Sequence, residues 1–427
     1  MPSVTGASSI ALQLEDVNDV IPLLVESAHS LDARIKDNGR SNRVSTKSFR
    51  VRIQTALTGA VAKINLDGGS LPVGGGSQWD QFVVTPLAYC VPIQYTRLAD
   101  LVGEPKDVAT VNPVSKTIAD AAIYIQRTRD VFLNTGGNGI LASVASVAAP
   151  TVTLTSTPFG ARNLHLGQVV QFYQPGAAGV KRTTNSSLIT AISNGLGGTQ
   201  SITVVDAVTG GAQTLTSVAA GDVVVVDGVA VNPDPFINGI PVFHSTSTSG
   251  TLMGINRTNG YVVANGVDIA GASITLPTLR LAQNQIVQAL GPDGLKGQCW
   301  HTHPSQVQAY EELGFQLQYV PLDGGKASKF DGLFQKMTID GREIISNIHA
   351  DQTRWDLVNI KSWGKVKWGN PPFWFKNRGG QTVFQGYDTS GNPQTIEKSF
   401  LVDAIQYYVD NPKALGSVTT CKVPAGN

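Results

Sequence analysis

Residues 1–95 of this 427-residue chain lack the apolar content to build a core of their own, and this constrains the fold most. Between Asp32 and Arg52 the chain carries seven basic residues and two acidic ones, after a weakly amphipathic start. This composition predicts an extended N-terminal arm over residues 1–47. Its positive charge has two interpretations. It is either a solvated face or a segment beside a polyanion, where it would act through counterion release rather than base contacts.

Two alternating runs after the arm predict a β-ribbon. Phe49, Val51 and Ile53 alternate with polar residues, and residues 87–95 alternate in the same way. The intervening residues 58–78 hold six glycines, which suits a flexible tip. We therefore predict one long ribbon over residues 48–95. A two-stranded ribbon is marginal by itself in water, so it must lie on its own chain or on a neighbour.

The clearest helix is expected over residues 113–135, within a segment that we place at 96–143. Apolar side chains such as Ala121, Ile125 and Phe132 recur at helical spacing, and Gly136-Gly137 marks the end. The opposite face of the helix is polar and includes Arg127 and Asp130.

Residues 144–232 differ sharply in composition, because only six of these 89 residues are charged. Threonine, valine, serine, glycine and alanine dominate in short runs that are typical of strands. Leu166–Val170 and Ala220–Val224 look alike, which suggests two similar hairpins. We predict a small inserted β-rich domain here.

The remainder predicts a mixed domain at residues 233–360 and a returning segment at 361–427. Helices are expected near Leu276–Leu290 and from Pro304 onward, with a strand at Gly297–His303 between them. The returning segment contains the aromatic run Pro371–Phe375 and a last strand at Ser399–Val409. The fold class is therefore α+β.

Composition argues against charge-driven binding, a disulfide-stabilised fold and a membrane protein. Charged residues make up 15% of the chain and the net charge is +1, so bulk charge drives no association with nucleic acid or lipid. The three cysteines lie far apart and predict no disulfide framework, as expected in a reducing cytoplasm. The N-terminus shows no signal-peptide pattern and no run reaches 18 apolar residues, so we expect no membrane association.

Cys299, His301 and His303 form the sharpest metal-like pattern, since alternate residues of one strand share a face and could offer zinc three ligands. At ~3.3 Å rise per residue the three side chains are spread along the strand, and no fourth ligand is evident. We favour a half-buried strand that leads into the helix at Pro304. No metal site is predicted.

Other motif matches do not lie in the structural context that their function needs. Gly137–Ala142 matches G-x-G-x-x-A but follows a helix and precedes a strand-like run, so a helix-ending turn is the better interpretation. Gly325-Lys326 lacks the spacing of a phosphate loop. No nucleophile elbow or H-E-x-x-H occurs, and the six histidines form no evident acid–base constellation. We predict no catalytic residues and no cofactor, and hence no enzyme.

The order of these parts resembles the major capsid proteins of tailed bacteriophages with the HK97-like fold. In that resemblance 1–47 is the N-arm, 48–95 the extended E-loop, 113–135 the spine helix of the peripheral domain, 233–360 the axial domain, and 361–427 the return into the peripheral domain. Four short runs are similar to segments of the family: Asn238-Gly239-Ile240 followed by Gly254–Arg257, His303-Pro304-Ser305, Thr338–Ile345, and Asp410–Ala414.

The resemblance implies a structural shell protein that assembles as pentamers and hexamers into an icosahedral head around double-stranded DNA. It implies localisation in the virion after assembly in the host bacterial cytoplasm, with non-specific packaged DNA, a portal and decoration proteins as partners. No long acidic or helical segment precedes the arm, so we expect a separate scaffolding protein. Some relatives crosslink subunits through a Lys–Asn isopeptide bond, and Lys63 could supply the amine. An ordinary exposed lysine is the favoured interpretation.

Two other classes stay open. A phage tail-tube or adhesin subunit would also be rich in glycine, threonine and strands, although it would not need the long helix and the mixed domain. A carbohydrate-active enzyme could use the insertion and the aromatic run 371–375 as a binding face. It would need paired catalytic carboxylates, which the sequence does not place.

Overall fold

A computed structural model describes most of the chain in eleven segments. They are residues 30–37, 42–43, 48–57, 75–96, 113–176, 179–194, 199–229, 236–318, 338–376, 379–387 and 393–424. Lys63 and Gly325-Lys326 lie outside the described residues. Within these segments no helix is both long and apolar enough to cross a membrane.

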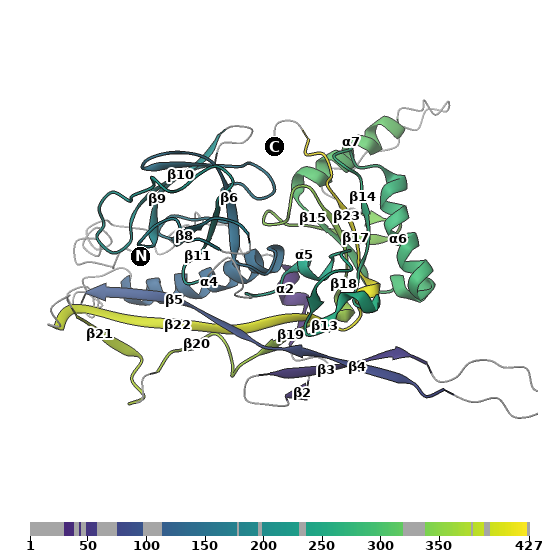
Figure 1. The fold of residues 1–427 in the computed structure, drawn as a ribbon, viewed down its shortest axis with the longest axis horizontal. Helices are drawn as coiled ribbons and strands as arrows, with labels where there is room; N and C mark the ends of the chain where they lie inside the picture. The colour runs from purple at the N-terminus through teal and green to yellow at the C-terminus, as the bar shows by residue number, and fades with distance from the viewer. Residues whose placement is uncertain are drawn as a thin grey trace, which may run out of the picture.

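One long sheet forms the base of the molecule, and its central strand is β22 (Pro393–Val409). β5 (Leu87–Thr96) pairs antiparallel with β22 over ten residue pairs. The other strands are β19 (Trp363–Lys367), β20 (Phe373–Trp374), β21 (Val383–Tyr387) and the short β1 (Lys36–Asp37). Figure 1 shows β5 and β22 side by side along the length of this base.

The expected long helix is confirmed as α4 (Pro113–Asn134), which packs on β5 and β22. Ala121 and Ile125 lie against Val91 and Leu401 of the sheet. The opposite face of α4 is buried at Arg127 and Asp130, however, while Gln126 is exposed. Asp130 is 1% exposed and accepts hydrogen bonds from the Asn347 amide, whereas Arg127 is 6% exposed because a second body of β-structure covers it (Figure 1).

That second body is a closed six-stranded barrel between residues 140 and 226. Its strands, in order around the barrel, are β10 (Gln200–Asp206), β7 (Thr151–Leu154), β6 (Ile140–Ala148), β11 (Val223–Val226), β8 (Val169–Tyr173) and β9 (Ser187–Asn194). The β-rich region therefore begins at Ile140, four residues before the predicted boundary. Its status as an insertion stays a prediction.

The two similar runs in the barrel make equivalent turns before β8 and β11, which pair with each other. Gly167 and Gly221 both have positive φ, where glycine is favoured. The next side chain in each run accepts a hydrogen bond from a backbone N–H three residues earlier, Gln168 from His165 and Asp222 from Ala219. The likeness in sequence thus reflects one turn used twice. The two turns precede neighbouring strands of one barrel and do not form two separate hairpins.

A second sheet stands beside the base. Its strand order is β14 (Asn265–Asp268), β23 (Gly416–Thr419), β18 (Trp355–Asn359), β15 (Gln298–Thr302), β17 (Arg342–Ser346) and β16 (Thr338–Ile339). The predicted helices flank it as α6 (Leu276–Leu290) and α7 (Pro304–Gln318). The prediction that all of 361–427 returns to the base is wrong at its end, because β23 pairs with β14 and β18.

Short elements join these bodies. They are α2 (Ser30–Arg34), β2 (Asn42–Arg43), α5 (Ile240–Phe243), β12 (Thr251–Leu252), β13 (Ile255–Asn256), and the 3-10 turns η1 (Arg257–Asn259), η2 (Pro292–Leu295), η3 (Ile360–Ser362) and η4 (Pro412–Ala414).

The predicted ribbon exists, but its second strand was assigned wrongly. β3 (Phe49–Ala56) pairs with β4 (Gln78–Val84), and β2 adds to its other edge. β5 belongs to the base sheet instead. All three runs alternate with a period of two, and alternation alone does not say which strand pairs with which.

A buried ion pair ties α4 to the base, and we predict that breaking it is costly. Arg129 Nε lies 2.7 Å from Asp403 Oδ2, with side-chain exposures of 10% and 0%. Asp403→Ala leaves the buried Arg129 guanidinium without its counter-ion, so the free energy of unfolding should fall by about 3–5 kcal/mol. Urea unfolding of the unassembled subunit measures this change.

The matched control is Asp293→Ala, which breaks an exposed pair with Lys296 at 2.7 Å. This change should cost no more than about 0.5 kcal/mol, because water screens the exposed charges. Equal losses in the two variants would contradict a structural role for the Arg129–Asp403 pair.

Candidate assembly surfaces

The ribbon has one face that packs on its own body and one that does not. Phe49, Val51, Phe82 and Val84 are at most 7% exposed and join the main core. The root of the ribbon is also held by hydrogen bonds, from Val83 N to Met253 O at 3.0 Å and from the Tyr261 hydroxyl to Asp80 Oδ2 at 2.5 Å. The ribbon therefore leaves the body in a defined direction, beneath the second sheet (Figure 1).

Towards its tip the ribbon exposes large apolar side chains. Leu57 is 82% exposed and Trp79 is 64% exposed, whereas the inward side chains are buried. Arg50 and Arg52 lie on the same outer face as Trp79, because the register pairs Gln54 with Trp79 and Arg52 with Gln81. Exposed apolar groups with a charged rim are typical of a protein interaction surface.

The arm is not uniformly extended, which corrects the prediction for residues 1–47. Leu31 is 1% exposed and Ile35 is 4% exposed, and both belong to the main core. Asp32 Oδ1 accepts hydrogen bonds from Lys365 Nζ at 2.8 Å and the Tyr407 hydroxyl at 2.6 Å. These two apolar residues in a mainly polar stretch were the available signal. Sequence reasoning missed them because they are only two.

The outer end of the base sheet carries a second exposed apolar surface. Phe373, Phe375 and Val383 are between 37% and 49% exposed. The Phe375 and Phe384 rings stack with centroids 5.8 Å apart. The aromatic run 371–375 is thus part of the sheet, since Phe373 pairs with Val402 of β22.

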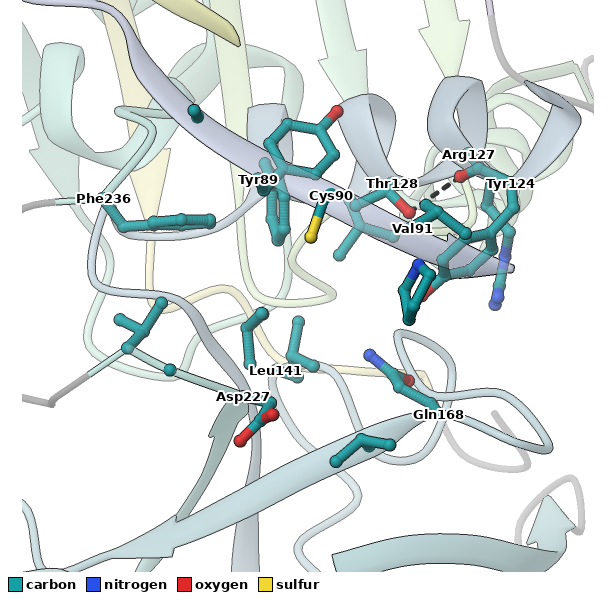
Figure 2. Close-up of a pocket in the computed structure, with 18 of the residues that line it drawn as sticks. Tyr89, Cys90, Val91, Tyr124, Arg127, Thr128, Leu141, Gln168, Asp227 and Phe236 are labelled. Atoms are coloured by element: carbon teal, nitrogen blue, oxygen red, sulfur yellow. Dashed lines mark hydrogen bonds between the residues drawn. The ribbon is translucent and has the colours of Figure 1, made fainter. Parts of the chain in front are cut away.

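A cavity of about 740 Å³ lies between β5, α4 and the barrel. Figure 2 shows Tyr89 and Cys90 reaching it from β5, Tyr124 from α4, and Asp227 from the barrel. Burial, with a smaller contribution from Asp227, raises the pKa of the Cys90 thiol. Asp227 is the one carboxylate among the described residues that line the cavity. The described lining therefore does not contain the carboxylate pair of a glycosidase.

Of the three candidate zinc ligands, Cys299 and His301 lie on β15, inside the second sheet, and His303 directly follows the strand. Cys299 Sγ lies 3.6 Å from Val358 O, and burial raises the pKa of this thiol to about 12. His303 Nδ1 accepts the Ser305 N–H at 3.1 Å, at the start of α7. His301 is 1% exposed. Within the described residues no group of three metal-ligating side chains converges. The strand that leads into the helix at Pro304 is present as predicted, but it is fully buried rather than half-buried.

The glycine motif at residues 137–142 is a turn between α4 and β6. Gly137 has φ +79°, and a Cβ there would lie 2.8 Å from Asn238 Oδ1 and 2.9 Å from Val242. Glycine is therefore required by backbone conformation and close packing, and the dinucleotide interpretation is excluded by the helix-to-strand order.

Comparison with known proteins identifies the fold. No protein-family model matches the sequence, and no curated protein matches it. The capsid asymmetric unit of cyanophage A-1(L) matches with a TM-score of 0.53 and 10% identity, covering 98% of this chain and 99% of that chain. The chain therefore has the HK97-like fold of capsid proteins.

Other solved shells are similar at lower scores. The capsid of a native GTA particle has a TM-score of 0.49 and 8% identity over 95% of each chain. The SrpI encapsulin complex from Synechococcus elongatus PCC 7942 has a TM-score of 0.44 and 9% identity, covering 98% of this chain and 96% of that chain.

The buried His303 predicts a pH-dependent stability. Burial, helped by the Arg162 charge, lowers the His303 pKa to about 3 from its ordinary value near 6.5. Between these two pH values His303 is protonated in the unfolded chain and neutral in the folded chain. The folded state therefore loses stability as the pH falls below about 6.5. From about pH 7 to about pH 5 the loss should approach roughly 2 kcal/mol.

His303→Asn isolates this contribution. The Asn side chain can accept the Ser305 N–H but does not titrate. Urea unfolding at both pH values should therefore show a smaller loss for His303→Asn than for the wild type. Parallel losses in the two proteins would show that His303 is not held neutral by its surroundings.

Proposed function

We propose that this chain is the major capsid (head) protein of a tailed phage, the repeating subunit of an icosahedral shell. The ribbon is the main observation behind this proposal, because Trp79 and Leu57 lie on it with most of their apolar surface in water. Covering such a surface requires another molecule, and copies of one chain arranged in closed rings supply it most simply. The fold shared with a cyanophage capsid subunit supports the same conclusion.

The finer parts of the proposal come from the resemblance in sequence. The copies form pentamers and hexamers, the shell encloses double-stranded DNA, and the chain is a component of the virion assembled in the bacterial cytoplasm. A portal, decoration proteins and a separate scaffolding protein are its partners. An ordinary lysine at position 63 predicts subunits that separate on boiling in detergent, as one band at the mass of a single chain.

The decisive experiment is electron microscopy of the purified chain, alone and with its scaffolding protein. We expect large particles, either rings of subunits or shells, and uniform closed shells when the scaffolding protein is present. Tubes or fibres would favour a tail or adhesin subunit. A stable monomer at high concentration would contradict the proposal.

The ribbon surface is tested by Trp79→Asp. A charge at this 64% exposed position places an ion in a surface that must become apolar on assembly, so particle formation should be lost. The unassembled subunit should keep its melting temperature, because Trp79 packs outside the core. Light scattering and thermal unfolding measure the two effects.

Trp79→Phe is the matched control for the ribbon, since it keeps an aromatic ring at the same place. This variant should still assemble. Assembly by both variants would show that the outer ribbon face is not used between copies.

Packaged DNA gives a separate test. Particles isolated from infected cells should protect double-stranded DNA from added nuclease, and the protected DNA should cover the whole genome without sequence preference. Particles that protect protein cargo but no DNA would indicate a shell of the encapsulin kind.

A further inference from the structure

The root of the arm, residues 30–37, lies where three parts of the fold meet. Its helix α2 contacts α4, its strand β1 extends the base sheet, and Arg34 reaches the second sheet. We name this segment the arm root. Apolar burial, ion pairs and backbone pairing hold it in place.

Apolar burial holds the arm root first. Leu31 and Ile35, one helical turn apart, are 1% and 4% exposed within the same core as Val366 and Tyr407. Burying such side chains is favourable relative to leaving them in water. The segment is therefore an integral part of the body rather than a loosely attached strand.

A buried cation holds the arm root second. Lys365 of β19 is 4% exposed, and its Nζ lies 2.8 Å from Asp32 Oδ1 and 3.6 Å from Asp37 Oδ1. Lys367 Nζ lies 2.5 Å from Asp37 Oδ2. Asp32 and Asp37 of the arm root thus pair with Lys365, and Asp37 also pairs with Lys367. Release of this segment would leave Lys365 without them, which is costly for a buried charge.

Backbone pairing and a bridging ion pair complete the arrangement. β1 pairs in parallel with β19, Lys36 with Gly364 and Asp37 with Lys365, and so covers the edge of the base sheet. Arg34 makes two hydrogen bonds, at 3.1 and 3.2 Å, to the carboxylate of Glu343 on β17. One eight-residue segment therefore connects the base sheet to the second sheet.

We propose that the arm root is an intramolecular clasp that sets the orientation of the second sheet relative to the base sheet and stays closed when copies assemble. The first half concerns the single chain. The second half rests on the proposed shell function, and it confines the contacts of the arm with other copies to residues outside 30–37.

Hydrogen exchange of the unassembled subunit tests the clasp. Lys365→Met removes the buried cation, and amide exchange in residues 30–37 should accelerate about tenfold while the barrel is unchanged. Lys361→Met, at an exposed lysine four residues earlier, is the matched control and should change neither. Where Lys365→Met fails to fold, Asp32→Asn gives the same comparison. No acceleration in a folded variant overturns the clasp.

A charge exchange tests the connection between the two sheets. Arg34→Glu and Glu343→Arg should each accelerate exchange in both residues 30–37 and β17, by about threefold to tenfold, because like charges then face each other. The double variant should restore the wild-type rates. Arg280→Glu breaks a pair with Asp340 inside the second sheet unit and should leave residues 30–37 unchanged. Absence of rescue in the double variant overturns the bridge.

Comparison of free and assembled subunits tests the second half of the proposal. Exchange in residues 30–37 should be equally slow in both. Exchange that rises about tenfold on assembly would show that the clasp opens, even though shells form. A chain that forms no particles would contradict the shell function and leave the single-chain results on the clasp standing.

Discussion

The burial of adjacent opposite charges on α4 constrains the rest of this structure. Arg129 points to the base and pairs with Asp403 of β22, while Asp130 accepts two hydrogen bonds from the Asn347 amide beyond β17. Burial lowers the Arg129 pKa, but the hydrogen bond and charge of Asp403 more than offset this and raise it overall. Each buried charge is tolerated only because its partner is in place, so the base and the second sheet must meet α4 in one arrangement.

The barrel is fixed to the same helix through polar contacts. Arg127 donates hydrogen bonds to the backbone oxygens of Arg162 and Leu164, in the segment between β7 and β8. The Tyr124 ring lies 4.3 Å from the His165 ring. One helix thus organises three bodies. Residues that would ordinarily face water on an amphipathic helix serve here as connections.

Apolar side chains are buried to different extents in different parts of the molecule. In the core around the C-terminal half of α4 the chain itself covers the apolar side chains, and Leu133 and Val366 are 0% exposed. The outer ribbon and the far end of the base sheet leave Trp79, Phe375 and Leu57 largely in water. A subunit with a buried core and exposed apolar extremities fits the proposed shell function, in which neighbouring copies would cover the extremities.

The sequence by itself determined the local elements and their order. Periodicity located α4, α6 and the strands β3 and β15, and Gly-x-Val-Val recurrence located two turns of one barrel, because these signals depend on neighbours a few residues apart. It also led, through the order of parts, to the HK97-like fold that the structural comparison confirms.

Only the tertiary structure decided which strands pair, which polar groups are buried and that residues 30–37 belong to the body. β5 joins β22 across about three hundred residues, and Asp403 finds Arg129 from a similar distance. Arg127 and Asp130 have the sequence pattern of surface residues, but the barrel covers Arg127 and the Asn347 segment beyond β17 covers Asp130. Such contacts are set by long-range packing and by the satisfaction of buried charges, and local sequence patterns carry no record of either.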